Sequence, residues 1–283
     1  MPMLKNTFCH IPGISVGAER ELWSGGIHSW DDASEAGRLP LSRGRAARLV
    51  QYAEISRRQL AAGNCRHFAG AIPARQHWRM FPEFRDTVAY LDIETTGLSA
   101  AQGSVITTIA LYDGRRIRHY VRGQNLDQFS ADIGDYGLIV TYNGKCFDVP
   151  FIEQNLGIRL DQAHIDLRYV LKRLGYGGGL KGCERSLGLD RGELQGVDGF
   201  FAVLLWEDYR RSGNIKALET LLAYNIQDVV NLETLLVMAY NLNLRETPFA
   251  ASHELPLPAA PQLPFQADHK TIGRLLQRYT SGY

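Results

Sequence analysis

The sequence of 283 residues contains no long run of apolar residues. A transmembrane helix needs roughly 20 such residues in succession, and a signal peptide needs an apolar core of about 7–15. The sequence therefore predicts neither a membrane span nor a signal peptide. We expect the chain to be cytoplasmic and to make no contact with a membrane.

Cysteine is also scarce. Cys9, Cys65, Cys146 and Cys183 lie far apart and form no CxxC pair. This spacing argues against a zinc knuckle, whose ligands come in close pairs, and against a disulfide framework. Four reduced and mostly buried thiols are the expected state.

An excess of either charge is missing as well, because the net charge is +1 at pH 7. The charges are nevertheless distributed unevenly: between Arg38 and Arg85, ten arginines face only two glutamates. Guanidinium groups form forked contacts with phosphate, so this segment predicts a nucleic-acid surface that includes Arg57 and Arg58. The alternative is a solvated helix face that binds nothing.

The pattern of elements divides the chain into three zones. Residues 1–85 are predicted to be a helical, arginine-rich extension with its clearest helix at 42–62, and residues 245–283 a proline-rich linker with a short tail. The zone between them, 86–244, has predicted strands at 87–96, 104–112, 116–122 and 138–142, followed by helices at 148–156, 166–174, 181–187, 200–212 and 215–242. This order indicates an α/β fold with a mixed sheet flanked by helices, and a ligand site at the carboxyl ends of strands.

Two acidic residues share the first predicted strand. Asp92 and Glu94 are two residues apart, so both side chains leave the same face, while Leu91 and Ile93 face the other way. Neighbouring carboxylates repel each other, and a hard divalent cation such as Mg²⁺ or Mn²⁺ is the natural compensation. Alone, the pair says little, because most such pairs are surface acids.

Two more acids follow later in the chain. Asp148 comes shortly after the fourth predicted strand, and a helix N-cap explains it as well as a metal ligand does. Asp228 interrupts the apolar stripe of the long helix, one turn after Tyr224. An acid in such a stripe needs a partner, unless it sits at the margin and tips toward water.

Three segments containing these acids resemble, in order, the three motifs of the DEDD exonucleases, which include the proofreading subunits of DNA polymerases. The segments are LDIETTGL at 91–98, YNGKCFD at 142–148 and YNIQD at 224–228. The third has the Tyr-x-x-x-Asp form, whereas the other form requires His at position 223, which is Ala. The resemblance is therefore to the tyrosine subclass, called DEDDy.

A closer resemblance, from about residue 7 to 240, is to the predicted bacterial exonucleases of the YprB type. It includes FCHIPGIS at 8–15, ERELWSGGIHSWDD at 19–32 and LETLLAYNIQDVVNLETLL at 218–236. This resemblance implies a ribonuclease H-like fold, with a mixed five-stranded sheet and helices around it.

The resemblance also implies a role for each motif residue. Two divalent metal ions, Mg²⁺ or Mn²⁺, would be held by Asp92, Glu94, Asp148 and Asp228. Tyr224 would orient the attacking water, since a phenol with an ordinary pKa of about 10 is a poor base at neutral pH.

Three further residues would contact the nucleic acid, again by resemblance. The backbone from Thr95 to Leu98 would hold the terminal nucleotide, and Asn143 would lie beside the substrate and steady the shell of the second metal.

Together these features predict a metal-dependent 3′→5′ exonuclease that acts on single-stranded DNA or RNA. Ribonuclease H-like sites also cut internal bonds, so a structure-selective endonuclease is one alternative, and a catalytically silent nucleic-acid-binding module is another. The presence of all four acids and the tyrosine argues against the silent module. The two flanking zones are also candidates for contact with a protein partner.

Overall fold

The computed structural model of the chain describes residues 3–189 and 199–281. Its centre is a five-stranded sheet with the order β3-β2-β1-β4-β5. The strands are β1 (Val88–Thr95), β2 (Ile106–Tyr112), β3 (Ile117–Val121), β4 (Leu138–Thr141) and β5 (Ala163–Asp166). β2 is antiparallel to β1 and to β3, whereas β4 is parallel to β1 and β5 is parallel to β4. The predicted mixed sheet is therefore confirmed.

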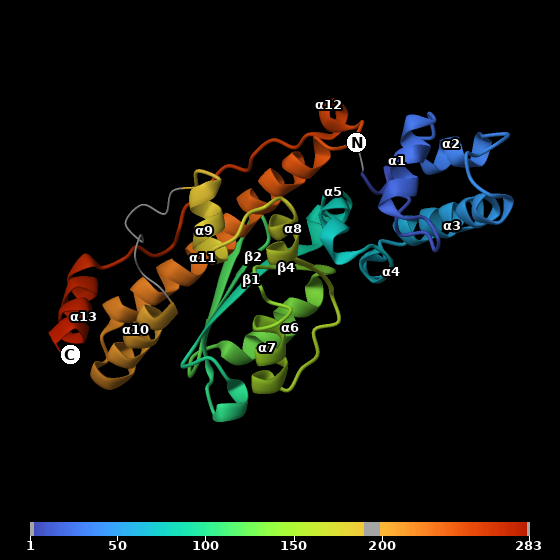
Figure 1. The fold of residues 1–283 in the computed structure, drawn as a ribbon. Coiled ribbons are helices and arrows are strands. Elements are labelled where there is room, and N and C mark those ends of the chain that lie inside the picture. The colour runs from blue at the N-terminus through green and yellow to red at the C-terminus, as the bar shows by residue number, and fades with distance from the viewer. Residues whose placement is uncertain (1–2, 190–198, 282–283) are drawn as a thin grey trace.

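Helices cover both faces of this sheet (Figure 1). The helices of this part of the chain are α6 (Phe129–Asp132), α7 (Asp148–Leu156), α8 (Leu167–Arg173), α9 (Gly179–Ser186), α10 (Gly199–Ser212) and α11 (Ile215–Leu244). Short 3-10 helices are η4 (Ala100–Gln102), η5 (Leu126–Gln128) and η6 (Ile133–Asp135). Local signals set the ends of two of these helices. Asn214 caps the start of α11 through its side chain, and α7 ends at Gly157, which has a left-handed φ of +66°.

The alternation of side chains along β1 separates two apolar cores. Leu91 and Ile93 pack in one cluster with Phe129 of α6 and Phe151 of α7. Tyr90 belongs to the other cluster, which contains the buried face of α11. Because side chains alternate along a strand, Asp92 and Glu94 point to the α11 side, as their spacing predicts.

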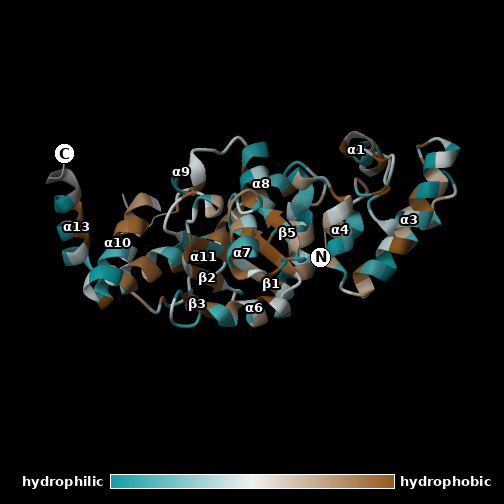
Figure 2. Ribbon diagram, turned by 90° about the horizontal axis from the view of Figure 1, so that it is seen from below, coloured by the Kyte–Doolittle hydropathy of each residue, from teal (hydrophilic) through white to brown (hydrophobic). Residues whose placement is uncertain are grey.

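The N-terminal zone is helical, as predicted, and lies at one end of the molecule (Figure 1). Its helices are α1 (Val16–Ser24), α2 (Trp30–Glu35), α3 (Arg43–Ala61), α4 (Cys65–Ala71) and α5 (Phe81–Phe84), with the 3-10 helices η1 (Leu4–Asn6), η2 (Ala74–Met80) and η3 (Arg85–Thr87). In Figure 2 the central strands are mostly hydrophobic, whereas α3 alternates between polar and apolar residues along its length. Such alternation is typical of a helix with one solvated face.

A buried ion pair joins two segments of this N-terminal zone. Arg79 donates from Nη1 to both carboxylate oxygens of Glu19, at 2.8 and 2.7 Å, and both side chains are almost fully buried. Glu19 also accepts from the backbone N–H groups of Phe8 and Cys9. The guanidinium lies 5.4 Å from the ring centre of Trp23. These contacts connect the segment that follows η1 with α1 and η2.

The C-terminal zone returns along the molecule toward α10 (Figure 1). Its helices are α12 (Ala250–His253) and α13 (His269–Ser281). Phe249 packs edge-on against Trp23 of α1, and Arg274 of α13 forms an ion pair with Asp208 of α10. The proline-rich segment between α12 and α13 thus spans from the N-terminal helices to the opposite end of the fold.

Two further findings concern the cysteines and the membrane. Cys9, Cys65 and Cys183 are buried free thiols, whereas Cys146 is exposed. In the parts of the chain that the structure describes, none of the helices has both the length and the apolar character needed to cross a membrane.

The buried pair predicts a large loss of stability when one partner is neutralised. Glu19→Gln leaves the Arg79 charge buried without its counter-ion, so we expect the free energy of unfolding to fall by about 3–5 kcal/mol. The control is Glu207→Gln, which removes an exposed pair with Arg211 whose side chains are 46% and 78% exposed, and this change should leave stability nearly unchanged. Urea unfolding followed by tryptophan fluorescence measures both variants. Equal stabilities of the two variants would contradict the structural role of the pair.

Candidate metal centre

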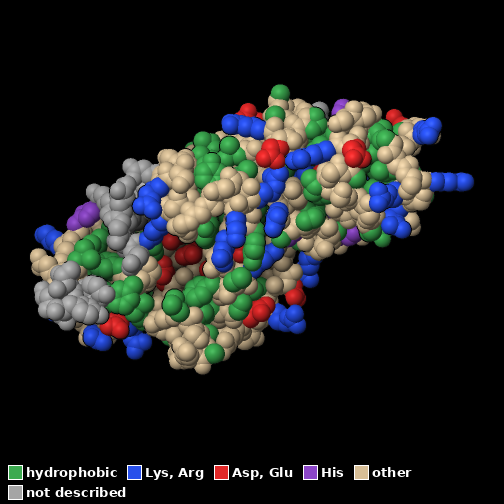
Figure 3. Space-filling model, viewed as in Figure 1, with side chains coloured by type: hydrophobic (Ala, Val, Ile, Leu, Met, Phe, Trp, Pro, Cys, Tyr) green, Lys and Arg blue, Asp and Glu red, His purple; other side chains and the backbone are tan. Residues whose placement is uncertain are grey.

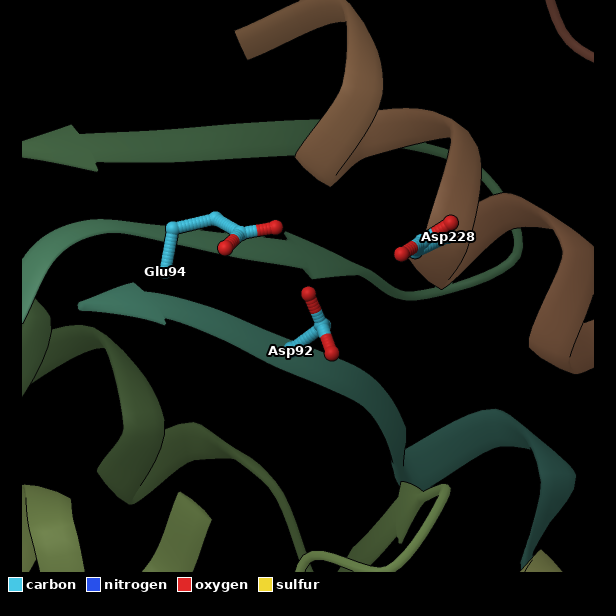
Figure 4. A group of neighbouring side chains, drawn as sticks. All are labelled: Asp92, Glu94 and Asp228. Carbon is cyan, nitrogen blue, oxygen red and sulfur yellow. The ribbon is translucent and has the colours of Figure 1, made fainter. Parts of the chain in front are cut away.

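Three carboxylates from distant parts of the sequence meet between β1 and α11. One oxygen each from Asp92, Glu94 and Asp228 lies within 4.8 Å of the other two. Figure 4 shows the three carboxyl groups directed toward a common space, with the first two on β1 and the third on α11. Asp228 is only 6% exposed, so it does not tip toward water at the edge of the helix. The tertiary structure therefore brings three of the four predicted acids together in one cluster.

The local electrostatics of this cluster favour a cation. Burial raises the pKa of Asp92 well above its ordinary value, and the charges of Asp228, Asp148 and Glu94 raise it further. Three carboxylates at this spacing either retain protons or share a cation. An all-oxygen, all-carboxylate donor set suits hard divalent ions such as Mg²⁺ and Mn²⁺. The residues present thus fit a divalent metal.

A buried amide fixes the orientation of Asp92. Asn225 of α11 donates from Nδ2 to Asp92 Oδ2 at 2.7 Å, and its own Oδ1 accepts from Thr108 Oγ1 of β2 at 3.0 Å. The hydrogen bond from Asn225 opposes the rise in the pKa of Asp92. Sequence reasoning missed Asn225, although an amide in the buried stretch of α11, three residues before Asp228, was an available signal.

Asp148 lies beside the three-carboxylate cluster and contacts β1. It is the first residue of α7, and its Oδ1 accepts from the backbone N–H of Ile93 at 3.2 Å. Burial raises its pKa to about 7. The N-cap interpretation is wrong, because Phe147 occupies the cap position and no side chain caps the helix. Asp148 is instead held against the strand that carries Asp92.

All four acids line one pocket of about 360 Å³, together with Tyr224 and Lys181. Figure 3 shows acidic side chains at the bottom of a hollow, with Lys and Arg side chains near its rim. Lys181 of α9 places its Nζ 4.8 Å from the centre of the Tyr224 ring. Asn231 of α11 donates to Glu184 of α9 at 2.8 Å, a buried contact that holds α9 in this position. The pocket is thus acidic at its base and has a cation in its wall.

Of the three residues predicted to contact nucleic acid near the motifs, Asn143 lines the pocket, whereas Thr95 and Leu98 do not. Asn143 lines the pocket and has a φ of +67°, a left-handed conformation that is uncommon outside glycine and is often found at functional sites. Thr95 and Leu98 follow a β-bulge at the end of β1. Thr95 Oγ1 donates to the carbonyl of Gly97 at 2.7 Å, and the side chain of Leu98 is 89% exposed. Neither Thr95 nor Leu98 is among the residues that line the pocket, so their contact with nucleic acid stays a prediction.

Arg57 and Arg58 lie on α3, which lies at the end of the molecule opposite to α10 (Figure 1). Arg57 donates to the carbonyl of Trp30 and to Ser34, and it forms ion pairs with Asp31 and Glu54. Arg58 also pairs with Glu54, but its side chain is 73% exposed. The contact of these two arginines with nucleic acid stays a prediction, and Arg57 would have to exchange its present partners to make it.

Comparison with known proteins places this geometry in a family. A family model described as the RNase H superfamily matches residues 89–240. Among solved structures, the family B DNA polymerase from the hyperthermophilic archaeon Pyrobaculum calidifontis is similar over 54% of this chain, with 18% sequence identity and a TM-score of 0.38. The similar region makes up 27% of that polymerase chain. None of the curated proteins matches the chain.

The carboxylate cluster predicts an unusual dependence of stability on pH. The pKa of Asp148 is raised from 3.8 to about 7, and that of Asp92 is also raised, so the metal-free folded state retains protons that the unfolded state releases in this range. The contribution of these groups to stability therefore falls as pH rises from about 4 to 7. Asp228→Asn removes one of the repelling charges and should stabilise the metal-free protein by about 1–3 kcal/mol at pH 8, and by less at pH 5.

Thermal unfolding in EDTA and in Mn²⁺, at both pH values, measures this effect. We expect Mn²⁺ to stabilise the wild type more strongly at pH 8, where metal and protons compete less for the carboxylates, and to stabilise Asp228→Asn only weakly. Because other buried groups also titrate, the quantity compared is the difference between variant and wild type. An equal response of both proteins to Mn²⁺ would contradict the metal centre.

Proposed function

The chain belongs to the RNase H superfamily, whose model matches more than half of its residues, and on that premise we propose that it is a metal-dependent 3′→5′ exonuclease. Its substrate is single-stranded DNA or RNA. The observation that carries the proposal is the meeting of Asp92, Glu94 and Asp228 in one pocket with Tyr224. Within the superfamily, the tyrosine one turn before Asp228 supports the DEDDy subclass and a relationship to YprB-type exonucleases.

The four acids are the proposed metal ligands. Asp92, Glu94 and Asp228 would hold one divalent ion, and Asp148 would hold a second one together with Asp92. When bound, the ions would supply Lewis acidity, which activates water and offsets the negative charge of the phosphoryl group.

The remaining pocket residues act by positioning. Asn225, itself held by Thr108, keeps the carboxylate of Asp92 in one orientation. Tyr224 is 3% exposed and lies one helical turn from Asp228, so its phenol is placed to orient a water beside the carboxylates. Lys181 places a positive charge in the same wall, where it would attract the phosphate of the substrate.

The size of the pocket supports action on a single strand. A space of about 360 Å³ suits a single small group, and its acids lie at the base of a hollow (Figure 3). The paired bases of a duplex would have to separate before a phosphodiester reached these acids. A single strand meets this requirement without that cost, which supports a single-stranded substrate.

The zones of the chain have separate proposed roles. The family match lies inside residues 86–244, which we propose as the catalytic domain. Residues 1–85 would form the arginine-rich extension and residues 245–283 the linker and tail. Arg85, the last residue of the extension, joins it to the proposed catalytic domain through an ion pair with Glu233 of α11. Both flanking zones are proposed surfaces for nucleic acid or a protein partner.

The activity is tested with a closed circular single strand and with the same strand made linear and labelled at its 5′ end. We expect a ladder from the linear strand, starting at its 3′ end, in Mg²⁺ or Mn²⁺ and not in EDTA. The circle should stay intact. Cleavage of the circle would instead identify an endonuclease, and binding without cleavage of any DNA or RNA strand would identify a silent binding module.

Two variants separate the metal ligands from the positioning tyrosine. Asp92→Asn should lower activity by about 10³-fold or more and should weaken stabilisation by Mn²⁺. Tyr224→Phe should lower kcat by about 10²-fold while leaving stabilisation by Mn²⁺ unchanged, because it removes only the phenol. The matched control is Asp161→Asn, which makes the same chemical change as Asp92→Asn at an exposed acid between α7 and β5. Its activity and its stabilisation by Mn²⁺ should equal those of the wild type. Full activity of Asp92→Asn would exclude the proposed site.

A further inference from the structure

A second cavity adjoins the carboxylate pocket, and we call it the basic cavity. Its volume is about 700 Å³, and its walls include Arg168, Lys172 and Tyr176. Tyr142, Asn143, Gly178 and Gly179 line both the basic cavity and the carboxylate pocket. Because the two spaces share these walls, a chain-like ligand with one phosphate at the carboxylates can continue directly into the basic cavity.

The charge of the basic cavity is opposite to that of the pocket beside it. Arg168 and Lys172 are both exposed and lie one turn apart on α8. Among the residues that the structure describes, neither forms an ion pair with a carboxylate. Arg168 donates from Nη1 to Asn143 Oδ1, which uses one of its five N–H groups. Two cations on one face of a cavity suit the phosphates of a nucleic-acid backbone.

Asp166 holds in place the turn that carries Asn143, one of the residues that line both spaces. Its carboxylate accepts from the backbone N–H groups of Asn143 at 2.8 Å, of Lys145 at 3.1 Å and of Arg168 at 3.0 Å. These bonds tie the turn after β4 to the start of α8. The left-handed conformation of Asn143 is part of this turn. The cavity is therefore supported before any ligand binds.

The rest of the cavity suits unpaired bases. Tyr142 and Tyr176 are half-buried aromatic side chains in its wall. The loop 175–179 contributes Gly175, Gly178 and Gly179, all with φ between +75° and +88°, and the absence of side chains there lets a ligand approach the backbone. Aromatic rings beside cations are the combination by which proteins bind single strands without regard to sequence.

We propose that the basic cavity binds the nucleotides on the 5′ side of the scissile phosphate of a single strand. Lys172 and Arg168 contact backbone phosphates, and Tyr176 stacks on a base. The cavity therefore makes the enzyme select polynucleotide strands over isolated nucleotides. This inference rests on the proposed function, since it takes the carboxylate pocket as the place where the strand is cut.

The test compares Lys172→Glu with Lys270→Glu in the full-length protein. Lys270 is an exposed lysine on α13, and its replacement makes the same change in net charge. Binding of a fluorescently labelled oligothymidylate of ten nucleotides is measured by fluorescence anisotropy in EDTA over a range of salt concentrations. We expect Lys172→Glu to weaken binding about tenfold at low salt and to reduce the slope of log Kd against log salt by about 0.7 for each lost phosphate contact. Lys270→Glu should match the wild type.

Two further measurements separate strand binding from other effects. Tyr176→Leu should weaken binding of the oligothymidylate about tenfold with no change in salt slope, because it removes stacking and not charge. The p-nitrophenyl ester of thymidine 5′-monophosphate carries no second phosphate for Lys172 to contact. Its kcat/KM should therefore fall much less in Lys172→Glu than kcat/KM for the oligothymidylate.

Equal binding by Lys172→Glu and Lys270→Glu would overturn the proposal even if the protein is an exonuclease. An equal loss on the ester and on the oligothymidylate would also overturn it, because Lys172 would then act through the carboxylate pocket. If the wild type cleaves nothing, and Lys172→Glu nevertheless binds the oligothymidylate more weakly than the wild type, the proposed function is overturned and the strand-binding site is retained.

Discussion

The mutual repulsion of three carboxylates within 4.8 Å is the constraint around which this site is built. Such a cluster persists in a fold only if its surroundings hold each carboxylate in place and if a cation or protons offset the charge. The strand β1 holds two of the acids, and the helix α11 holds the third and also supplies Asn225, which donates to Asp92. Helix α11 is thus both the main apolar cover of this face of the sheet and a source of polar groups for the site.

The buried charges of this molecule differ in how they are compensated. Glu19 meets Arg79, and Asp208 meets Arg274, in pairs that connect segments of the chain to each other. The acids of the pocket instead gather around one point, where burial and then the charges of the neighbouring acids raise the pKa of Asp92. A buried pair of opposite charges favours one arrangement of the chain. A buried group of like charges favours a ligand, and this difference separates the structural charges from those for which we propose a function.

The proposed substrate path follows from the sign of charge along the surface. The pocket is negative at its base, and the adjoining basic cavity carries Arg168 and Lys172. A nucleic-acid strand is repelled by the uncompensated acids and attracted by the cations beside them. Metal binding would remove the repulsion by the acids and leave the attraction by the cations. The arginines of α3 lie at a distance from this path, and most of the donors of Arg57 are already engaged within the N-terminal helices.

The sequence alone determined those features that depend on neighbouring residues, namely the type of an element and the face on which a side chain lies. Alternation along β1 and the 3.6-residue period of α11 predicted both elements and the faces on which Asp92, Glu94 and Asp228 lie, because these patterns depend only on backbone geometry. The strand β5 was missed because four residues, Ala163 to Asp166, carry no clear period. Only the tertiary structure decided what depends on contacts between distant segments. The approach of Asp228 to β1, the bond from Asn225 to Asp92 and the cavity shared by Asn143 and Arg168 join residues far apart in the chain, and no local pattern encodes such distances.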